Sequence, residues 1–248
     1  GVGSMGQHHA RVYQELPTVD LVGVADADPQ QAAETAEQYG TTPMSVDSLL
    51  SVADAVSVVV PTAYHYETGL DVIEAGVDLL IEKPIAEDPA TGRELQEAAE
   101  SAGVTLQVGH VERFNPAVRT LSEIVTDLDV IALDTQRLGP PTHREIGDGV
   151  ALDLMIHDAD ILLSLVDAPV ADIYAAETAG NQYVAATVEF ETGVVATLTA
   201  SRVTQQKVRT LSVTAEDCRV NVDYMAQSVQ INRHSLPEYV ETDGDVRY

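Results

Sequence analysis

The first half of the sequence alternates short apolar runs with longer amphipathic segments. The apolar runs show no polar alternation, which is typical of strands buried on both faces of a parallel sheet. We expect such strands at 20–25, 54–60, 77–81 and 104–108. The amphipathic segments predict helices at 7–16, 67–75 and 88–102. This alternation predicts an α/β domain over residues 1–118, with the doubly wound parallel sheet of a Rossmann fold.

The second half follows a different pattern. Residues 130–137 predict a strand and residues 150–166 a largely apolar helix. After this helix, apolar and polar residues alternate with a period of two, which is typical of antiparallel strands. The alternating runs lie at 184–191, 194–201, 209–214, 219–224 and 228–232. Residues 119–248 are therefore expected to form an α+β domain with an open, mostly antiparallel sheet.

The charge of the chain is strongly one-sided. Forty acidic residues stand against 13 basic ones, and the net charge is −27 at pH 7. Such a surface argues against binding to nucleic acids or to anionic membranes, because phosphate contacts need cations. The acidic residues are scattered and 45% of residues are hydrophobic, which favours a folded protein over a disordered one. We interpret the charge as a halophilic adaptation, because salt screens the self-repulsion.

Cysteine content and hydropathy bear on the compartment. The lone cysteine, Cys218, excludes an internal disulfide and fits a reducing cytoplasm. No stretch approaches the roughly 20 apolar residues that cross a bilayer, so no membrane partner is expected.

A glycine motif opens the chain. Gly1-Val-Gly3-Ser4-Met5-Gly6 has the G-x-G-x-x-G spacing of a dinucleotide-binding turn, in which backbone amides at a helix N-terminus hold the pyrophosphate. Such a turn normally follows a strand, and none precedes Gly1, so the first strand is expected to be missing. The chain also ends without a closing helix, which suggests an incomplete C-terminus.

An acidic residue then indicates the cofactor. Asp26 lies 20 residues after Gly6, directly after the strand expected at 20–25, where a carboxylate accepts hydrogen bonds from the adenosine ribose. The alternative is a turn or helix-cap role within Asp-Ala-Asp-Pro. Residues 27–33 contain no basic group that would accept a 2′-phosphate. The expected cofactor is therefore NAD, with NADP disfavoured.

Polar residues directly follow three predicted strands, at Pro61-Thr62, Glu82-Lys83-Pro84 and Gly109-His110. Ligands of parallel sheets bind beyond the carboxyl ends of the strands, so these groups are expected to line one crevice. Lys83 is one of only two lysines in the chain. A chain that has nearly abandoned lysine and keeps one at a strand end is expected to use it.

Asp153 and His157 stand four residues apart in the helix expected at 150–166. This spacing places both side chains on one helix face, where a carboxylate can orient a histidine that acts as a general base or acid. An isolated pair of this kind is more often a surface ion pair. Asp158 and Asp160 follow, but helix geometry brings only the first two together, so no metal site is expected.

These motifs together resemble the glucose–fructose oxidoreductase/inositol dehydrogenase (Gfo/Idh/MocA) family over essentially the whole chain. The resemblance rests on the glycine motif with His9, Pro61-Thr62 with His65, Glu82-Lys83-Pro84, and the Asp153/His157 helix. Residues 108–116 (VGHVERFNP) and 152–158 (LDLMIHD) are similar to the branch that contains UDP-N-acetylglucosamine 3-dehydrogenases.

The resemblance implies NAD-dependent oxidation of a secondary hydroxyl of a sugar or nucleotide sugar, with C3 of UDP-N-acetylglucosamine as the sharpest expectation. Alternatives are a free-sugar or inositol dehydrogenase, an NAD-dependent glycosidase, or a non-catalytic dinucleotide-binding regulator. A homodimer or homotetramer that pairs through the open sheet is also implied.

The resemblance also implies roles for individual residues. Lys83, Asp153 and His157 are expected to be catalytic, with His157 as the base and Lys83 as a second candidate. Pro84 is expected after a cis bond, with a trans turn proline as the alternative. A nucleotide-sugar diphosphate favours arginine contacts, although each arginine could equally form a surface ion pair. The residues expected to bind the cofactor are Gly1, Gly3, Ser4, Met5, Gly6, Asp26, Pro61, Thr62, His65, Glu82, Lys83 and Pro84. Those expected to bind the substrate are Arg113, Asn115, Arg137 and Arg144.

Overall fold

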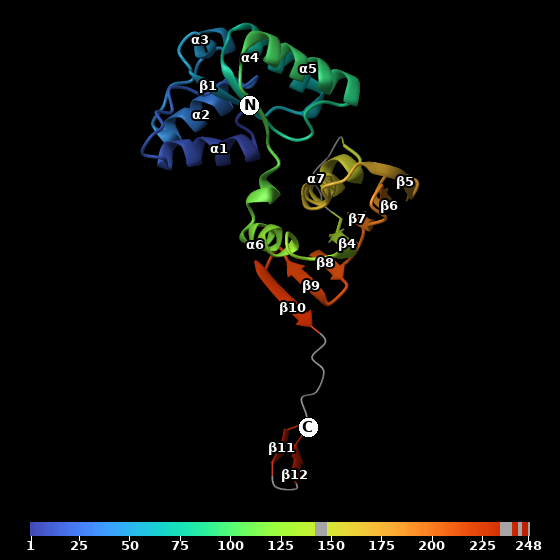
Figure 1. Cartoon of the computed structure of the whole chain (residues 1–248). Coiled ribbons are helices and arrows are strands. Elements are labelled where there is room, and N and C mark those ends of the chain that lie inside the picture. The colour runs from blue at the N-terminus through green and yellow to red at the C-terminus, as the bar shows by residue number, and fades with distance from the viewer. Residues whose placement is uncertain (142–147, 234–239, 243–244, 248) are drawn as a thin grey trace. The chain divides into compact units, whose positions relative to one another are not determined.

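A computed structural model describes residues 1–141, 148–233, 240–242 and 245–247. The chain divides into two compact units, Gly1–His110 and Val111–Tyr248 (Figure 1). The division falls shortly before the domain boundary predicted between residues 118 and 119. Arg144, one of the expected substrate-binding residues, lies outside the described residues.

The first unit contains a parallel sheet, as its uninterrupted apolar runs predict. Its strands follow the order β1-β2-β3. Their bounds are β1 (Ala55–Val58), β2 (Asp78–Ile81) and β3 (Leu106–Val108). Helices α4 (His65–Glu74) and α5 (Pro89–Ala102) pack against each other, and α4 also contacts β1 and β2. Val58, Val72, Leu79, Ile81 and Leu95 form the buried core, which confirms the α/β prediction.

Three further helices complete this unit: α1 (Ser4–Glu15), α2 (Pro29–Tyr39) and α3 (Val46–Leu50). The sequence pattern did not predict α2, because its buried face consists of the small residues Ala32, Thr35 and Ala36 rather than a large apolar stripe. Local signals specify it instead. The Asp28 side chain accepts a hydrogen bond from the Gln30 amide, and Gly40 ends the helix with φ +65°.

The predicted strand at 20–25 does not join the sheet. Among the described residues its one bridge pairs Val24 with Pro43, supported by hydrogen bonds between Val24 and residues Thr42 and Met44. A strand forms its backbone hydrogen bonds with neighbouring strands, and among the described residues no strand lies on the other side of residues 20–25. A cavity of about 460 Å³ lies there, lined mainly by apolar side chains of residues 19–25 and 55–60.

The second unit is built on a seven-stranded sheet with the order β10-β9-β8-β4-β7-β6-β5. In the described part of this sheet only β4 and β7 pair in parallel, so the prediction of a mostly antiparallel sheet is confirmed. The strands are β4 (Val130–Leu138), β5 (Val170–Glu177), β6 (Tyr183–Phe190), β7 (Val195–Ser201), β8 (Val208–Ala215), β9 (Cys218–Asp223) and β10 (Ser228–Arg233). A separate two-stranded sheet pairs β11 (Val240–Thr242) with β12 (Asp245–Arg247).

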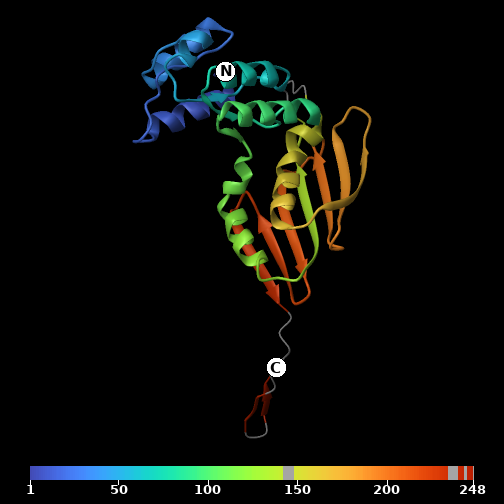
Figure 2. The same ribbon diagram turned by 45° about the horizontal axis from the view of Figure 1, so that its top comes forward.

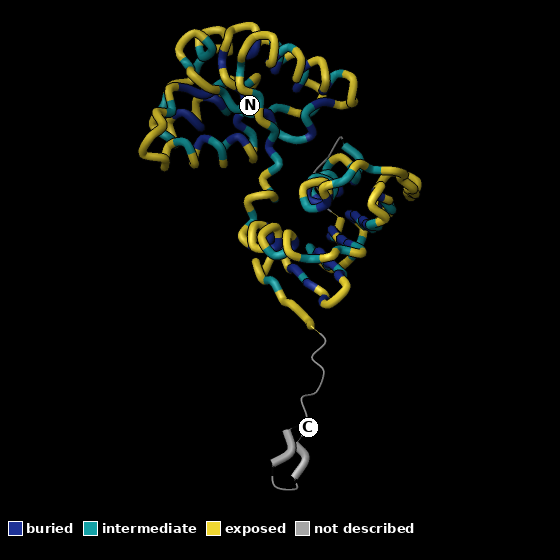
Figure 3. The backbone as a smooth tube through the Cα atoms, in the orientation of Figure 1, coloured by how far each residue is buried: buried dark blue, intermediate teal, exposed yellow. Residues whose placement is uncertain are grey.

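Two helices cover one face of the large sheet (Figure 2). Helix α6 (Pro116–Val125) contacts β9 and β10, and α7 (Ile156–Leu165) contacts β4 and β7. Leu121, Leu133, Ile161, Leu198 and Leu211 are among the buried side chains between these layers. Burial therefore alternates along the central strands, as the period of two requires (Figure 3). Among the described residues, no helix is long and apolar enough to cross a membrane.

Candidate functional site

The glycine turn fits a dinucleotide phosphate because its backbone packs too closely for side chains. A Cβ on Gly6 would lie 2.1 Å from the Gly1 carbonyl oxygen, and one on Gly1 would lie 2.3 Å from the Val59 oxygen. The turn leads into α1, where Gly3 is the N-cap and Ser4 and Met5 begin the first turn with exposed side chains. Because Gly3 has no side chain, it does not cap the amides at the N-terminus of α1, the helix end that favours an anion.

Asp26 is tied to this turn. Its Oδ2 accepts a hydrogen bond from the Val2 amide at 2.7 Å, and its Oδ1 accepts one from the Asp28 amide at 2.9 Å. Burial alone would raise the pKa of the Asp26 carboxyl, but these hydrogen bonds together hold the pKa below its ordinary value. The turn role is thus present in the structure, and the carboxylate remains anionic beside the glycine motif.

The Glu82-Lys83-Pro84 turn follows β2, and the Lys83–Pro84 peptide bond is cis, as the family resemblance implied. The Glu82 carboxylate meets Nε2 of His9 at 3.0 Å, which links the turn to α1. Burial opposes ionisation of Glu82, yet the hydrogen bond to His9 helps to hold the pKa of Glu82 below its ordinary value. Glu82 therefore braces the turn that carries Lys83, whose side chain is half-buried.

His65, at the start of α4, also braces this turn. The ring is 1% exposed, and its Nδ1 and Nε2 lie 2.7 Å and 2.9 Å from the carbonyl oxygens of Pro84 and Val60. A carbonyl only accepts, so a neutral ring donates to one of them and an imidazolium to both. His65 therefore holds the two strand ends together through buried hydrogen bonds. Pro61 and Thr62, at the η1 turn (Thr62–Tyr64), occupy the neighbouring strand end after β1.

The segment that carries Asp153 and His157 differs from the regular helix that its sequence predicts. A π-helical turn, η3 (Ala151–Met155), precedes α7 and contains Asp153, whereas His157 lies in the first turn of α7. The Asp153 carboxylate accepts a hydrogen bond from Nη2 of Arg202 at 3.0 Å. His157 is half-buried, and its Nδ1 is fully buried. Single-turn π segments are frequent at functional sites.

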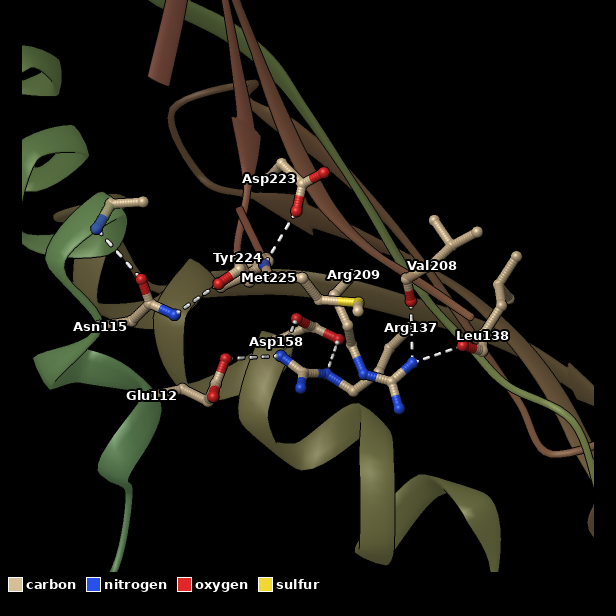
Figure 4. Close-up of polar contacts among 11 residues, drawn as sticks. Glu112, Asn115, Arg137, Leu138, Asp158, Val208, Arg209, Asp223, Tyr224 and Met225 are labelled. Carbon is tan, nitrogen blue, oxygen red and sulfur yellow. Dashed lines mark hydrogen bonds and ion pairs between the residues drawn. The ribbon is translucent and has the colours of Figure 1, made fainter. Parts of the chain in front are cut away.

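Two more carboxylates of this segment are each held by an arginine from another element. Asp158 accepts two hydrogen bonds from Arg137 of β4, at 2.8 Å and 2.9 Å, and Glu112 lies 3.2 Å from the same guanidinium (Figure 4). Asp160 accepts two from Arg113, at 2.6 Å and 2.5 Å. Arg113 and Arg137, both expected to bind substrate, thus form ion pairs within their own unit.

Asn115, which was expected to bind the substrate, holds the start of α6 instead. Asn115 caps α6 through its Oδ1, 3.1 Å from the Ala117 amide, and its Nδ2 donates to the Tyr224 carbonyl at 3.2 Å. Arg202 was missed by the sequence analysis, although its position directly after the strand at 194–201 was a signal. Within the part of the chain that the structure describes, no three His, Cys, Asp or Glu side chains gather as metal ligands would.

Comparison with known proteins identifies the family. Residues 1–110 match the family described as "Oxidoreductase family, NAD-binding Rossmann fold", and residues 131–221 match the GFO/IDH/MocA C-terminal domain. The chain belongs to the Gfo/Idh/MocA oxidoreductase family. The resemblance in the motifs is thereby confirmed, and with it the assignment to a family of dehydrogenases that use a nicotinamide dinucleotide.

Individual relatives of this family cover most of the chain. The UDP-N-acetylglucosamine 3-dehydrogenase of Acidithiobacillus ferrooxidans is 34% identical over 236 residues, which are 93% of this chain and 74% of that protein. A solved structure of that organism's enzyme superposes with a TM-score of 0.89 and 32% identity, over 98% of this chain and 82% of the other. The D-glucoside 3-dehydrogenase of Escherichia coli is 34% identical over 177 residues, 65% of this chain and 50% of that protein.

Proposed function

We propose that this chain is an NAD-dependent dehydrogenase that oxidises the C3 hydroxyl of UDP-N-acetylglucosamine. The observation that supports this choice of substrate is the 34% identity to a UDP-N-acetylglucosamine 3-dehydrogenase over 93% of the chain. Lys83 after β2 and His157 in the first turn of α7 supply the polar groups that the chemistry needs. From the family resemblance we also propose a homodimer or homotetramer that pairs through the uncovered face of the large sheet.

Alcohol oxidation needs a group that takes the hydroxyl proton. We assign this role to His157, and because its Nδ1 is fully buried, Nε2 is the nitrogen that takes the proton. From the family resemblance we also assign Asp153 to support the histidine, and Lys83 to hydrogen-bond the substrate oxygen and stabilise developing alkoxide charge. Gly1, Gly3 and Gly6 would hold the pyrophosphate of NAD⁺, and Asp26 would accept hydrogen bonds from its adenosine ribose. The cofactor would supply the hydride acceptor for the substrate carbon.

The test is NADH absorbance with NAD⁺ and a panel of UDP-sugars, free sugars and inositols. Because the net charge of −27 supports our proposal of a halophilic protein, the assay is run in dilute buffer and in molar KCl, and we expect the higher rate in KCl. A signal with UDP-N-acetylglucosamine supports the proposal. Activity confined to free sugars refutes the nucleotide-sugar substrate. If no substrate yields NADH although NAD⁺ binds, the proposed dehydrogenase activity is refuted, and the glycosidase or the regulator is favoured.

A free glycoside is the second candidate substrate. The D-glucoside 3-dehydrogenase of Escherichia coli is as similar as the nucleotide-sugar enzyme, at 34% identity, although over only 65% of this chain. The panel separates the two, because a glucoside dehydrogenase loses little activity when the nucleotide is removed from the substrate.

The cofactor preference is expected to depend on Asp26. In Asp26→Asn the side chain keeps one oxygen for a backbone amide but loses the charge that repels a 2′-phosphate. We therefore expect the ratio of kcat/KM for NAD⁺ to that for NADP⁺ to fall about tenfold, the factor that corresponds to about 1.4 kcal/mol. Asp28→Asn is the matched control, because it makes the same carboxylate-to-amide change at the nearby N-cap of α2. An unchanged ratio in Asp26→Asn would contradict the assignment.

A further inference from the structure

Three arginines gather at one end of the seven-stranded sheet, where β4 and β7 end and β8 begins. Arg137 lies near the end of β4, Arg202 directly follows β7, and Arg209 is the second residue of β8. Arg137 is paired with Asp158 and Glu112, and Arg202 with Asp153. Their charges are therefore already balanced by carboxylates of the same unit.

Arg209 differs from the other two because it is held by backbone alone. Its Nη1 donates to the carbonyl oxygens of Leu138 at 2.5 Å and Val208 at 2.8 Å (Figure 4). These two bonds use both hydrogens of Nη1 and fix the half-buried guanidinium in place. Within the described residues no carboxylate forms an ion pair with Arg209. The Nε and Nη2 edge, which suits bidentate binding of an anion, is left without a protein acceptor among them.

Electrostatics single out the same residue. Burial and the neighbouring Arg137 hold the pKa of Arg209 below its ordinary value, although Asp158, Glu112 and Asp153 act in the opposite direction. The pKa values of Arg113 and Arg137, which have carboxylate partners, are shifted upward instead. An arginine stays charged in proteins, so Arg209 is a fixed positive charge that an incoming anion would stabilise.

We propose that Arg209 binds an anionic group of the substrate, the diphosphate of a nucleotide sugar, through its Nε and Nη2 atoms. This inference rests on the proposed function and deepens it. Arg113 and Arg137 do not take this role, because an anion would have to displace the carboxylates that already occupy their bidentate edges. Arg209 lies opposite Arg137 in the β4–β8 register, and Arg137 binds Asp158, the residue directly after His157, so the charge of Arg209 lies near the segment that carries His157.

Direct binding tests the inference without turnover. Calorimetry at constant ionic strength compares UDP, inorganic pyrophosphate and uridine on the full chain. We expect wild type to bind UDP at least tenfold more tightly than uridine, and Arg209→Met to lose about 10- to 100-fold in UDP affinity while its uridine affinity is unchanged. Arg119→Met is the control, since Arg119 is an exposed arginine of α6 whose loss changes the net charge equally.

Kinetics separates a binding role from a structural one. In Arg209→Met we expect a raised KM for UDP-N-acetylglucosamine, a kcat within about twofold, and an unchanged kcat/KM for neutral N-acetylglucosamine. Arg209→Lys keeps the charge but loses the bidentate edge, so its KM for UDP-N-acetylglucosamine is expected to lie between those of wild type and Arg209→Met. Arg209→Gln keeps a donor for the Leu138 and Val208 carbonyls, and the same measurements on it replace those on Arg209→Met if the latter does not fold.

The outcomes are distinct. Equal UDP and uridine affinity in wild type, no loss of UDP affinity in Arg209→Met, or equal losses for charged and neutral substrates would each overturn the role of Arg209. If UDP affinity depends on Arg209 but no sugar is oxidised, the anion site stands and the proposed function fails.

Discussion

Replacing His157 by Asn is expected to lower kcat by about 10²- to 10⁴-fold, the usual contribution of a general base. The proposed catalyst is Nε2 of a half-buried ring whose Nδ1 is fully buried in the first turn of α7. Asn has a similar polar character but cannot take a proton near neutral pH. NADH formation with UDP-N-acetylglucosamine, measured at saturating NAD⁺, gives the loss directly.

Two comparisons make the His157 result specific. His8→Asn applies the same chemical change to an exposed histidine of α1 and is expected to leave kcat unchanged. Lys83→Met is expected to lower kcat as well, but the acidic limb of the pH–rate profile should persist in it and vanish in His157→Asn. If the acidic limb of the pH–rate profile vanished in Lys83→Met and persisted in His157→Asn, the lysine would be the base, which would contradict our assignment.

The sheet of the second unit was predictable because its central strands are buried on one face. Strands predicted at 209–214 and 219–224 are observed at Val208–Ala215 and Cys218–Asp223, since Leu211, Val213, Val220 and Val222 alternate with polar residues. The edge strand β5 was not predicted, because it lacks this one-sided burial. Nearly all of its residues are exposed, so no alternation marks it.

The candidate site was only partly predictable. Motif spacing indicated which residues the chemistry needs, and the glycine turn and the cis Pro84 are present as expected. Spacing could not indicate that Asp153 lies in a π-helical turn, because the i,i+4 rule assumes a regular helix. It also could not indicate which arginine meets which carboxylate. Arg202 reaches Asp153 from 49 residues away, a pairing that follows from the contact between η3 and β7.

The ion pair between Arg137 and Asp158 is expected to have the largest effect on folding. Their side chains are 6% and 2% exposed, and the ring of Tyr224 lies 5.3 Å from the guanidinium carbon. Burial raises the pKa of the Asp158 carboxyl, and the two hydrogen bonds from Arg137 oppose this rise. Without Arg137 the carboxylate would be a buried charge with no bidentate partner.

We therefore expect Arg137→Met to lower the free energy of unfolding by about 3–5 kcal/mol, the usual cost of breaking a buried pair by removing one partner. Urea unfolding of the full chain at constant KCl, followed by near-ultraviolet circular dichroism, measures the loss. In the double variant with Asp158→Leu most of it should return, because the buried carboxylate is gone and the other partner of Arg137, Glu112, is 25% exposed to solvent.

Arg113→Met is the matched control, since it removes the same kind of bidentate contact from Asp160 at a site where the arginine is 51% exposed. Solvent screens that pair, so we expect it to cost only up to about 1 kcal/mol. Equal losses in Arg113→Met and Arg137→Met would show that burial does not decide the strength of these pairs. Because Asp158 directly follows His157, Arg137→Met should also lower kcat even where the variant remains folded. Loss of stability with full kcat would mean that this ion pair stabilises the fold without positioning His157.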